Sequence, residues 1–171
     1  MKKSCLLNNK LTKTIISIFL FQIMSCSSID GEVSKLVSSM TLEEKIGQMT
    51  QVDYRYLADK SDIKKYFLGS ILSGGGSTPP TNQPSSWVEL YNGFQQEALK
   101  TRLKIPLIYG IDAVHGHNNV LGATMFPHNI GLGCMDDKAL VQEIAAATAA
   151  EVKATGLDWT FAPCVAVAQD E

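Results

Sequence analysis

The chain has 171 residues, enough for one domain of ordinary size, and 45% of them are hydrophobic, which excludes an intrinsically disordered protein. Its 15 Lys and Arg are outnumbered by 17 Asp and Glu, so there is no net positive charge to attract nucleic acid. The four cysteines include no C-x-x-C pair, which excludes a disulfide framework and a metal site of that kind.

The N-terminus has the organisation of an export signal. Lysines precede an uncharged apolar run from Ile15 to Met24, which has about half of the ~20 residues that a membrane-spanning helix needs. We therefore expect residues 1–25 to be a cleaved signal peptide, which leaves 11 basic against 17 acidic side chains, a net charge of −6. Ile23-Met24-Ser25-Cys26 resembles a bacterial lipobox, which predicts lipidation of Cys26, a tether and lead-in over residues 26–39, and attachment to a membrane through that lipid only. Ordinary secretion with an unmodified Cys26 is the alternative.

A capping box at Thr41–Glu44 predicts a short helix, which passes into a first strand near Met49. Asp62–Leu68 is amphipathic and predicts a second short helix, and Gly69–Ser73 predicts a second strand. The glycines at positions 74–76 then allow either a close approach of the backbone to a ligand or a simple turn. No Lys-Ser/Thr pair follows them, so they do not form a phosphate-binding loop.

A second capping box, Ser86–Glu89, predicts a longer helix with an apolar stripe at helical spacing: Trp87, Leu90, Tyr91, Phe94, Ala98 and Leu99. Pro106 then admits a third strand, Leu107–Asp112, which is followed by a long loop to about Cys134. Asp136 is expected to cap a helix over residues 137–155, with Gly156 as its left-handed end. Residues 157–163 supply a fourth strand.

Strands that alternate with helices predict parallel pairing, because parallel neighbours need a crossover that is usually helical. The fold class is therefore α/β, with about four parallel strands that make the N-terminal half of a (β/α)8 barrel. Asp112 ends the apolar third strand, and in such barrels the active site lies at the carboxyl ends of the strands. Asp112 is thus the candidate ligand-binding residue; capping the next turn or pairing with a nearby Arg or Lys are the structural alternatives.

The segment that surrounds Asp112 resembles the start of glycoside hydrolase family 3: it begins Tyr109-Gly110-Ile111-Asp112-Ala113-Val114-His115-Gly116-His117-Asn118-Asn119 and runs on to Phe126-Pro127-His128-Asn129-Ile130-Gly131-Leu132-Gly133. The resemblance implies a partial barrel domain over residues 40–171 that continues past Glu171. It also implies an exported, periplasmic or cell-surface enzyme that removes terminal β-glucosyl residues from oligosaccharides or β-glucans with retention. Asp112 would bind the terminal sugar, the Asp nucleophile and Glu acid/base would lie downstream, and no cofactor is needed. Residues 1–171 alone are then expected to be inactive.

Two other functions are compatible with the sequence. His115 and His117, with Asp112 and His128 nearby, form the one cluster that could bind a transition metal, as in a metal-dependent barrel hydrolase. The simpler interpretation is that the histidines, Asn118 and Asn119 hydrogen-bond the long loop to itself, so that no metal is needed. A surface lipoprotein that only binds sugar is the other alternative. We expect Cys134 and Cys164 to be small apolar side chains in or near the core, although a disulfide between them is possible.

Overall fold

The computed structural model describes residues 28–165. The predicted signal peptide and Cys26 lie outside these residues. The chain divides into two units between Ser39 and Met40, and the first contributes helix α2, Ile29–Ser39, to the described residues. None of the described helices is both long and apolar enough to cross a membrane.

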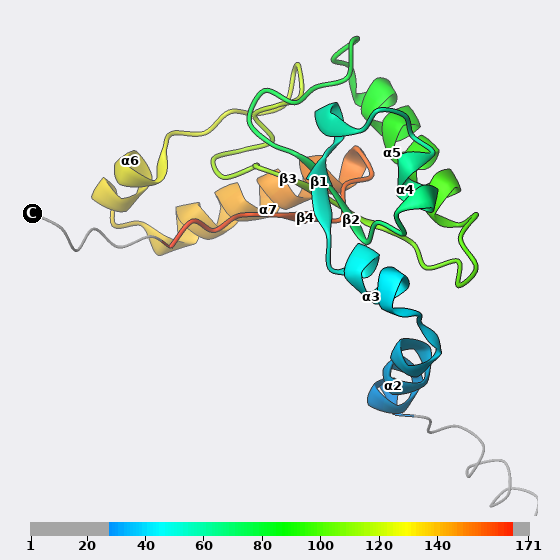
Figure 1. Cartoon of the computed structure of the whole chain (residues 1–171). Coiled ribbons are helices and arrows are strands. Elements are labelled where there is room, and N and C mark those ends of the chain that lie inside the picture. Colours follow the sequence, from blue (N-terminus) through cyan, green and yellow to red (C-terminus); the bar gives the residue numbers. More distant parts are fainter. Residues whose placement is uncertain (1–27, 166–171) are drawn as a thin grey trace, which may run out of the picture. The chain divides into compact units, whose positions relative to one another are not determined.

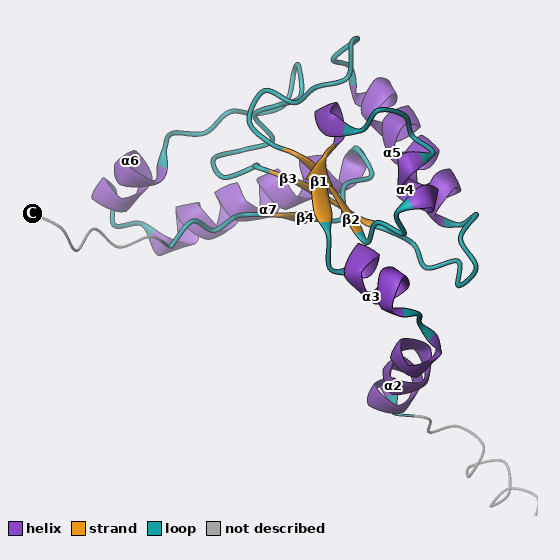
Figure 2. Ribbon diagram, in the orientation of Figure 1, coloured by secondary structure: helices purple, strands orange, loops and turns teal. Residues whose placement is uncertain are grey.

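The second unit is built on a four-stranded parallel sheet, as Figure 2 shows. Its strands are β1 (Gln51–Asp53), β2 (Ser70–Ser73), β3 (Ile108–Ile111) and β4 (Trp159–Thr160), in the order β1-β2-β3-β4. Each strand thus pairs with the next one along the chain, which is the arrangement of successive strands in a (β/α)8 barrel. The predicted α/β fold class is confirmed.

The first helices of this unit begin where the sequence predicted, but the second one ends at Lys65 and not at Leu68 as expected. Helix α3, Leu42–Gln48, begins with the predicted capping box, in which Glu44 N–H donates to Thr41 Oγ1 and Thr41 N–H donates to the Glu44 carboxylate. A 3-10 turn, η1 (Tyr54–Tyr56), follows β1, and α4 covers only Asp62–Lys65.

Three expectations about later helices were wrong. Helix α5 is Pro84–Ala98, so it begins two residues before the predicted capping box, because Pro84 favours the first turn of a helix. Helix α7 is Lys138–Ala154 and is capped by Asp137, not Asp136, whose backbone is left-handed. The long loop after β3 contains a further helix, α6, Asn129–Cys134.

The core lies between the sheet and its helices. Trp87, Phe94 and Ala98 from α5 are buried, and Phe94 packs edge-to-face on Tyr109 of β3 with ring centroids 5.4 Å apart. In Figure 1, α4 lies beside α5. Ile63 of α4 is buried in the same core, and Lys60, which precedes α4, places its Nζ over the Phe94 ring. The predicted stripe is correct except at Leu99, which is exposed because α5 ends at Ala98.

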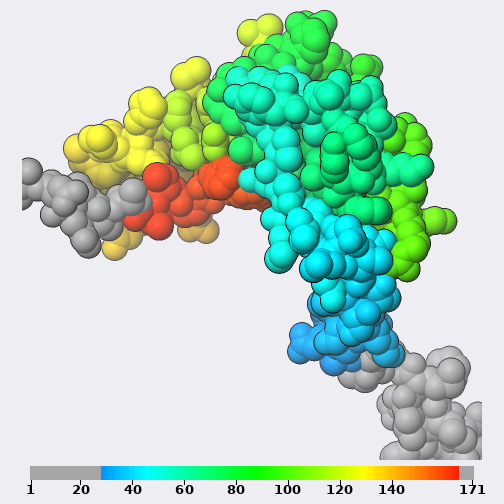
Figure 3. All heavy atoms as spheres, in the orientation of Figure 1, coloured from blue at the N-terminus to red at the C-terminus, as the bar shows by residue number. Residues whose placement is uncertain are grey.

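The opposite face of the sheet is open. Successive side chains of a strand point to opposite faces, and the Tyr109 and Ile111 side chains are buried against the helices, so Ile108, Gly110 and Asp112 face the other way. Ile108 is 51% exposed, and the Trp159 ring of β4 packs over Gly110. Figure 3 shows the segments of β1 and β4 at the surface of the same side.

The expectation for the two cysteines was wrong. Cys134 and Cys164 are free and exposed, because Cys134 ends the short surface helix α6 and Cys164 follows the last strand. Neither of them contributes to the core.

Candidate functional site

Asp112 lies at the carboxyl end of β3, on the open face of the sheet. Its backbone is fixed there because the next amide, Ala113 N–H, donates to Thr160 Oγ1 at the end of β4. The Asp112 side chain is half-buried and has no hydrogen-bond or ion-pair partner among residues 28–165. Neither structural alternative for Asp112, a cap or an ion pair, is therefore seen in this part of the chain.

A second carboxylate, Asp53, ends β1, which is separated from β3 by β2. Its Oδ1 accepts hydrogen bonds from the backbone and Nε of Arg55, both at 3.0 Å. Its Oδ2 accepts from Arg55 Nη2 at 2.9 Å, Ser77 Oγ at 2.7 Å and Gly74 N–H at 3.4 Å. With five donors around two oxygens, Asp53 has no lone pair left for a ligand.

The ionisation of Asp53 follows from these contacts. Burial by itself would raise the pKa of Asp53, but the hydrogen bonds from Arg55 and Ser77 outweigh burial and lower the pKa to about 2. Asp53 is therefore charged at all physiological pH values and holds the turn that begins at Gly74.

This turn, Gly74–Ser77, follows β2 and passes beside Asp112. It is closed by a 2.9 Å hydrogen bond from Ser77 N–H to Gly74 O. Ser73 pairs with Ile111 in the parallel register, so Gly74 lies next to Asp112 in the following row. A methyl group on Gly74 would lie 3.3 Å from Asp53 Oδ2 and 3.8 Å from Asp112 Oδ2.

The loop after β3 holds the same turn from the other side. Asn119 is buried, and its Nδ2 donates to Gly74 O at 3.0 Å. Asn82 Nδ2 donates to the Asn119 carbonyl, and the buried Trp87 Nε1 donates to Asn82 Oδ1, both at 2.8 Å. A chain of hydrogen bonds thus connects the core helix α5 to the backbone beside Asp112.

The histidines do not converge on one point. His117 is fully buried, and its Nε2 lies 2.7 Å from Thr155 Oγ1. His115 instead hydrogen-bonds the Phe126 carbonyl through Nδ1 and packs against His128, with the rings tilted and their centroids 4.1 Å apart. No group of three or more potential metal ligands occurs between residues 28 and 165. The loop is tied to itself through His115, as expected, but His117 binds Thr155, the residue that follows α7.

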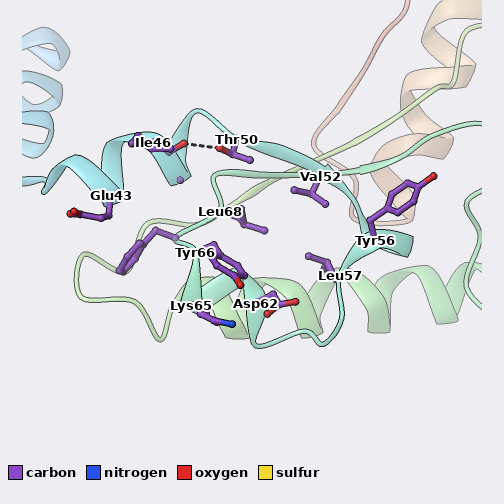
Figure 4. Close-up of a pocket in the computed structure, with 12 residues that line it drawn as sticks. Glu43, Ile46, Thr50, Val52, Tyr56, Leu57, Asp62, Lys65, Tyr66 and Leu68 are labelled. Atoms are coloured by element: carbon purple, nitrogen blue, oxygen red, sulfur yellow. Dashed lines mark hydrogen bonds between the residues drawn. The ribbon is translucent and has the colours of Figure 1, made fainter.

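A large cavity of about 560 Å³ lies elsewhere, beside β1, and Figure 4 shows the residues around it. Its walls are mainly apolar and aromatic, among them Ile46, Val52, Leu57 and Tyr66. The Asp62 carboxylate at its rim already accepts from the amides of Ala58 and Asp59. The mainly apolar walls suit a sugar less well than the unpartnered carboxylate at the end of β3, so Asp112 and not this cavity is the candidate site.

Sequence reasoning found Asp112 but missed its neighbours. Asp53 could have been found by the same signal, a carboxylate directly after a strand. Trp159 and Phe161 form an aromatic pair with ring centroids 4.3 Å apart, and Phe161 is 46% exposed. Phe161 N–H donates to Ile111 O, so this pair flanks Asp112 on the β4 side. Their alternation on one face was the signal that could have identified them.

Known proteins share the sequence pattern and the fold of this chain. Residues 41–171 match the model of the glycosyl hydrolase family 3 N terminal domain. The chain is 37% identical over 159 residues to a lysosomal beta glucosidase of Dictyostelium discoideum, covering 82% of this chain and 19% of that protein. It is 31% identical over 145 residues to a periplasmic beta-glucosidase of Salmonella typhimurium, covering 82% of this chain and 17% of that one.

Solved structures show the same relationship. An exo-1,3/1,4-beta-glucanase from a Pseudoalteromonas species superposes with a TM-score of 0.77 at 41% identity, over 85% of this chain and 19% of that one. A beta-glucosidase from Listeria innocua, solved with isofagomine, superposes with a TM-score of 0.57 at 29% identity, over 77% of this chain and 17% of that one. The chain therefore spans about a fifth of the length of these relatives.

Proposed function

The chain belongs to glycoside hydrolase family 3, and on this basis we propose that the protein is a β-glycosidase that releases terminal β-D-glucosyl residues from the non-reducing ends of oligosaccharides or β-glucans. The observation that carries the proposal is the position of Asp112: a carboxylate without a partner among the described residues, at the carboxyl end of a barrel strand. Relatives named beta-glucosidase and exo-beta-glucanase support the substrate class.

In this proposal Asp112 binds the terminal sugar and is not itself the group that breaks the bond. An ionised carboxylate accepts hydrogen bonds from sugar hydroxyls, and such charge-assisted bonds contribute about 1.5–3 kcal/mol each. The Trp159–Phe161 pair on the same face offers an apolar surface for the sugar ring. We expect from the family resemblance that the nucleophile and the acid/base lie outside residues 1–171. Two such carboxyl groups suffice for retaining hydrolysis without a cofactor.

We also propose that the protein is exported and anchored to a membrane by a lipid. A signal peptide over residues 1–25 with lipidation of Cys26 would export the protein and attach it to a bacterial membrane, where a polymeric glucan is accessible. The periplasmic relatives support export. Growth of the source cells with a radiolabelled fatty acid tests the anchor: label is expected in the wild-type protein and absent from Cys26→Ser. Label retained by Cys26→Ser, or absent from both proteins, contradicts the anchor and leaves the enzymatic proposal unaffected.

The activity is tested on the protein as its gene encodes it. Wild-type protein is expected to hydrolyse 4-nitrophenyl β-D-glucoside, with the β-anomer of glucose as the first product seen by NMR. Replacing Asp112 by Asn removes the negative charge but keeps the shape, so kcat/KM should fall about 10–150-fold. A wild type without glucosidase activity, or an Asp112→Asn variant with unchanged kcat/KM, contradicts the proposal.

A further inference from the structure

We propose that Gly74 is a substrate-binding position of the sugar site, because the absence of its side chain keeps Asp112 Oδ2 open to a sugar hydroxyl, and that Asp53 is a positioning residue that holds Gly74 there. This inference rests on the proposed function and adds to it a second strand loop, the Gly74–Ser77 turn.

The first step is the backbone of Gly74, which needs no glycine for conformational reasons. In this turn only Gly76 has a left-handed backbone, with φ of 78°, whereas Gly74 and Gly75 do not. An L-residue could therefore adopt the backbone of Gly74 without strain. What distinguishes Gly74 is its surroundings: a Cβ there meets the two carboxylates, while a Cβ on Gly75 has nothing within 4 Å.

The second step is the way in which the turn is held. The Gly74 amide and Ser77 hydroxyl donate to Asp53 on β1, and the Gly74 carbonyl accepts from Asn119 in the loop after β3. The turn is thus fixed from both sides of the position that faces Asp112. Because both polar groups of Gly74 are engaged, the turn cannot move away to make room for a larger side chain without breaking hydrogen bonds.

The third step is the difference between the two carboxylates. Asp53 is surrounded by donors from Arg55, Ser77 and Gly74, whereas Asp112 has none among the described residues. Asp53 therefore acts through the turn and does not touch the sugar, and the free lone pairs at this edge belong to Asp112. A methyl group 3.8 Å from Asp112 Oδ2 would cover one approach to those lone pairs.

The test compares Gly74→Ala with the matched control Gly75→Ala in the protein as its gene encodes it. Gly74→Ala is expected to raise KM for 4-nitrophenyl β-D-glucoside at least about tenfold, as expected for one lost charge-assisted hydrogen bond, with a smaller change in kcat. Gly75→Ala should stay within about twofold of wild type, since its methyl group has open space. Asp53→Asn, which loses the charge that holds Arg55 and the turn, should raise KM in the same direction.

A double-mutant cycle separates this role from a general loss of structure. In an Asp112→Ala background Gly74→Ala should change KM less than about threefold, because the oxygen that it would cover is gone. Equal effects of Gly74→Ala in both backgrounds, or equal effects of Gly74→Ala and Gly75→Ala in an active enzyme, overturn the inference alone. A wild type that neither binds nor hydrolyses β-glucosides overturns the proposed function and this inference with it.

Discussion

Acidification is expected to destabilise the packing of the β3 loop on α7 through His117. The Thr155 hydroxyl donates to the Val152 carbonyl at 2.8 Å, so its hydrogen is used and His117 Nε2 must carry the proton that bridges to Thr155 Oγ1. His117 Nδ1 then holds a bare lone pair, and it has no hydrogen-bond partner among the described residues. A proton added at Nδ1 would be a buried charge without an acceptor.

The sign of the effect follows from the pKa. Burial lowers the pKa of His117 below its ordinary value of 6.5, and the Glu151 carboxylate offsets this only in part. The unfolded chain therefore binds a proton before the folded chain does, so stability falls as pH drops below about 6.5 and stops falling below the folded-state pKa. Within this window the loss is at most about 1.4 kcal/mol for each pH unit.

Hydrogen exchange measures this loss locally, whatever the length of the chain around it. The free energy of opening for amides near Val152 should decrease between pH 7 and pH 5 in the wild type, after correction for the intrinsic exchange rate. A His117→Gln variant, which cannot be protonated, should lack this pH dependence. Equal pH dependence in both proteins would refute the assignment of a neutral, partly unsatisfied His117.

Three further results are expected. Phe94→Ala should destabilise the sheet unit by about 3–5 kcal/mol, because Phe94 is 1% exposed and packs on Tyr109; faster hydrogen exchange of the β3 amides checks it, and unchanged exchange contradicts it. Gly110→Ala should lower the free energy of unfolding by about 1–3 kcal/mol, since its methyl group would lie 2.5 Å from the Trp159 ring. In a Trp159→Leu background the same substitution should not lower it, and thermal unfolding measures both effects. The pKa of Asp53 is lowered from 3.8 to about 2, so the stabilisation that its charge gives to the 74–77 turn is complete above pH 3.8 and is lost as pH falls through about 2. Across this pH range, hydrogen exchange at Gly74 N–H should differ between the wild type and Asp53→Asn, and equal exchange contradicts this role of Asp53.

Much of the fold was predictable because it depends on local pattern. Apolar runs separated by helical segments predicted the parallel sheet, and the capping box of α3 was correct because both of its hydrogen bonds join residues three apart. The same local reasoning failed for α5, which begins at Pro84 before the expected cap Ser86, and for α7, which is capped by Asp137 next to the expected Asp136. The Pro84 ring and the left-handed backbone of Asp136 decided those ends.

The sequence by itself determined the parallel pairing of the strands, the core face of α5 and the placement of Asp112 at the end of a strand, because each follows from periodicity and from the geometry of parallel sheets. Only the tertiary structure decided what surrounds Asp112. Asp53 reaches Ser77 across 24 residues and Asn119 reaches Gly74 across 45, and such contacts depend on register and loop path. The burial of His117 and the exposure of both cysteines likewise depend on long-range packing, which a local pattern of residues does not determine.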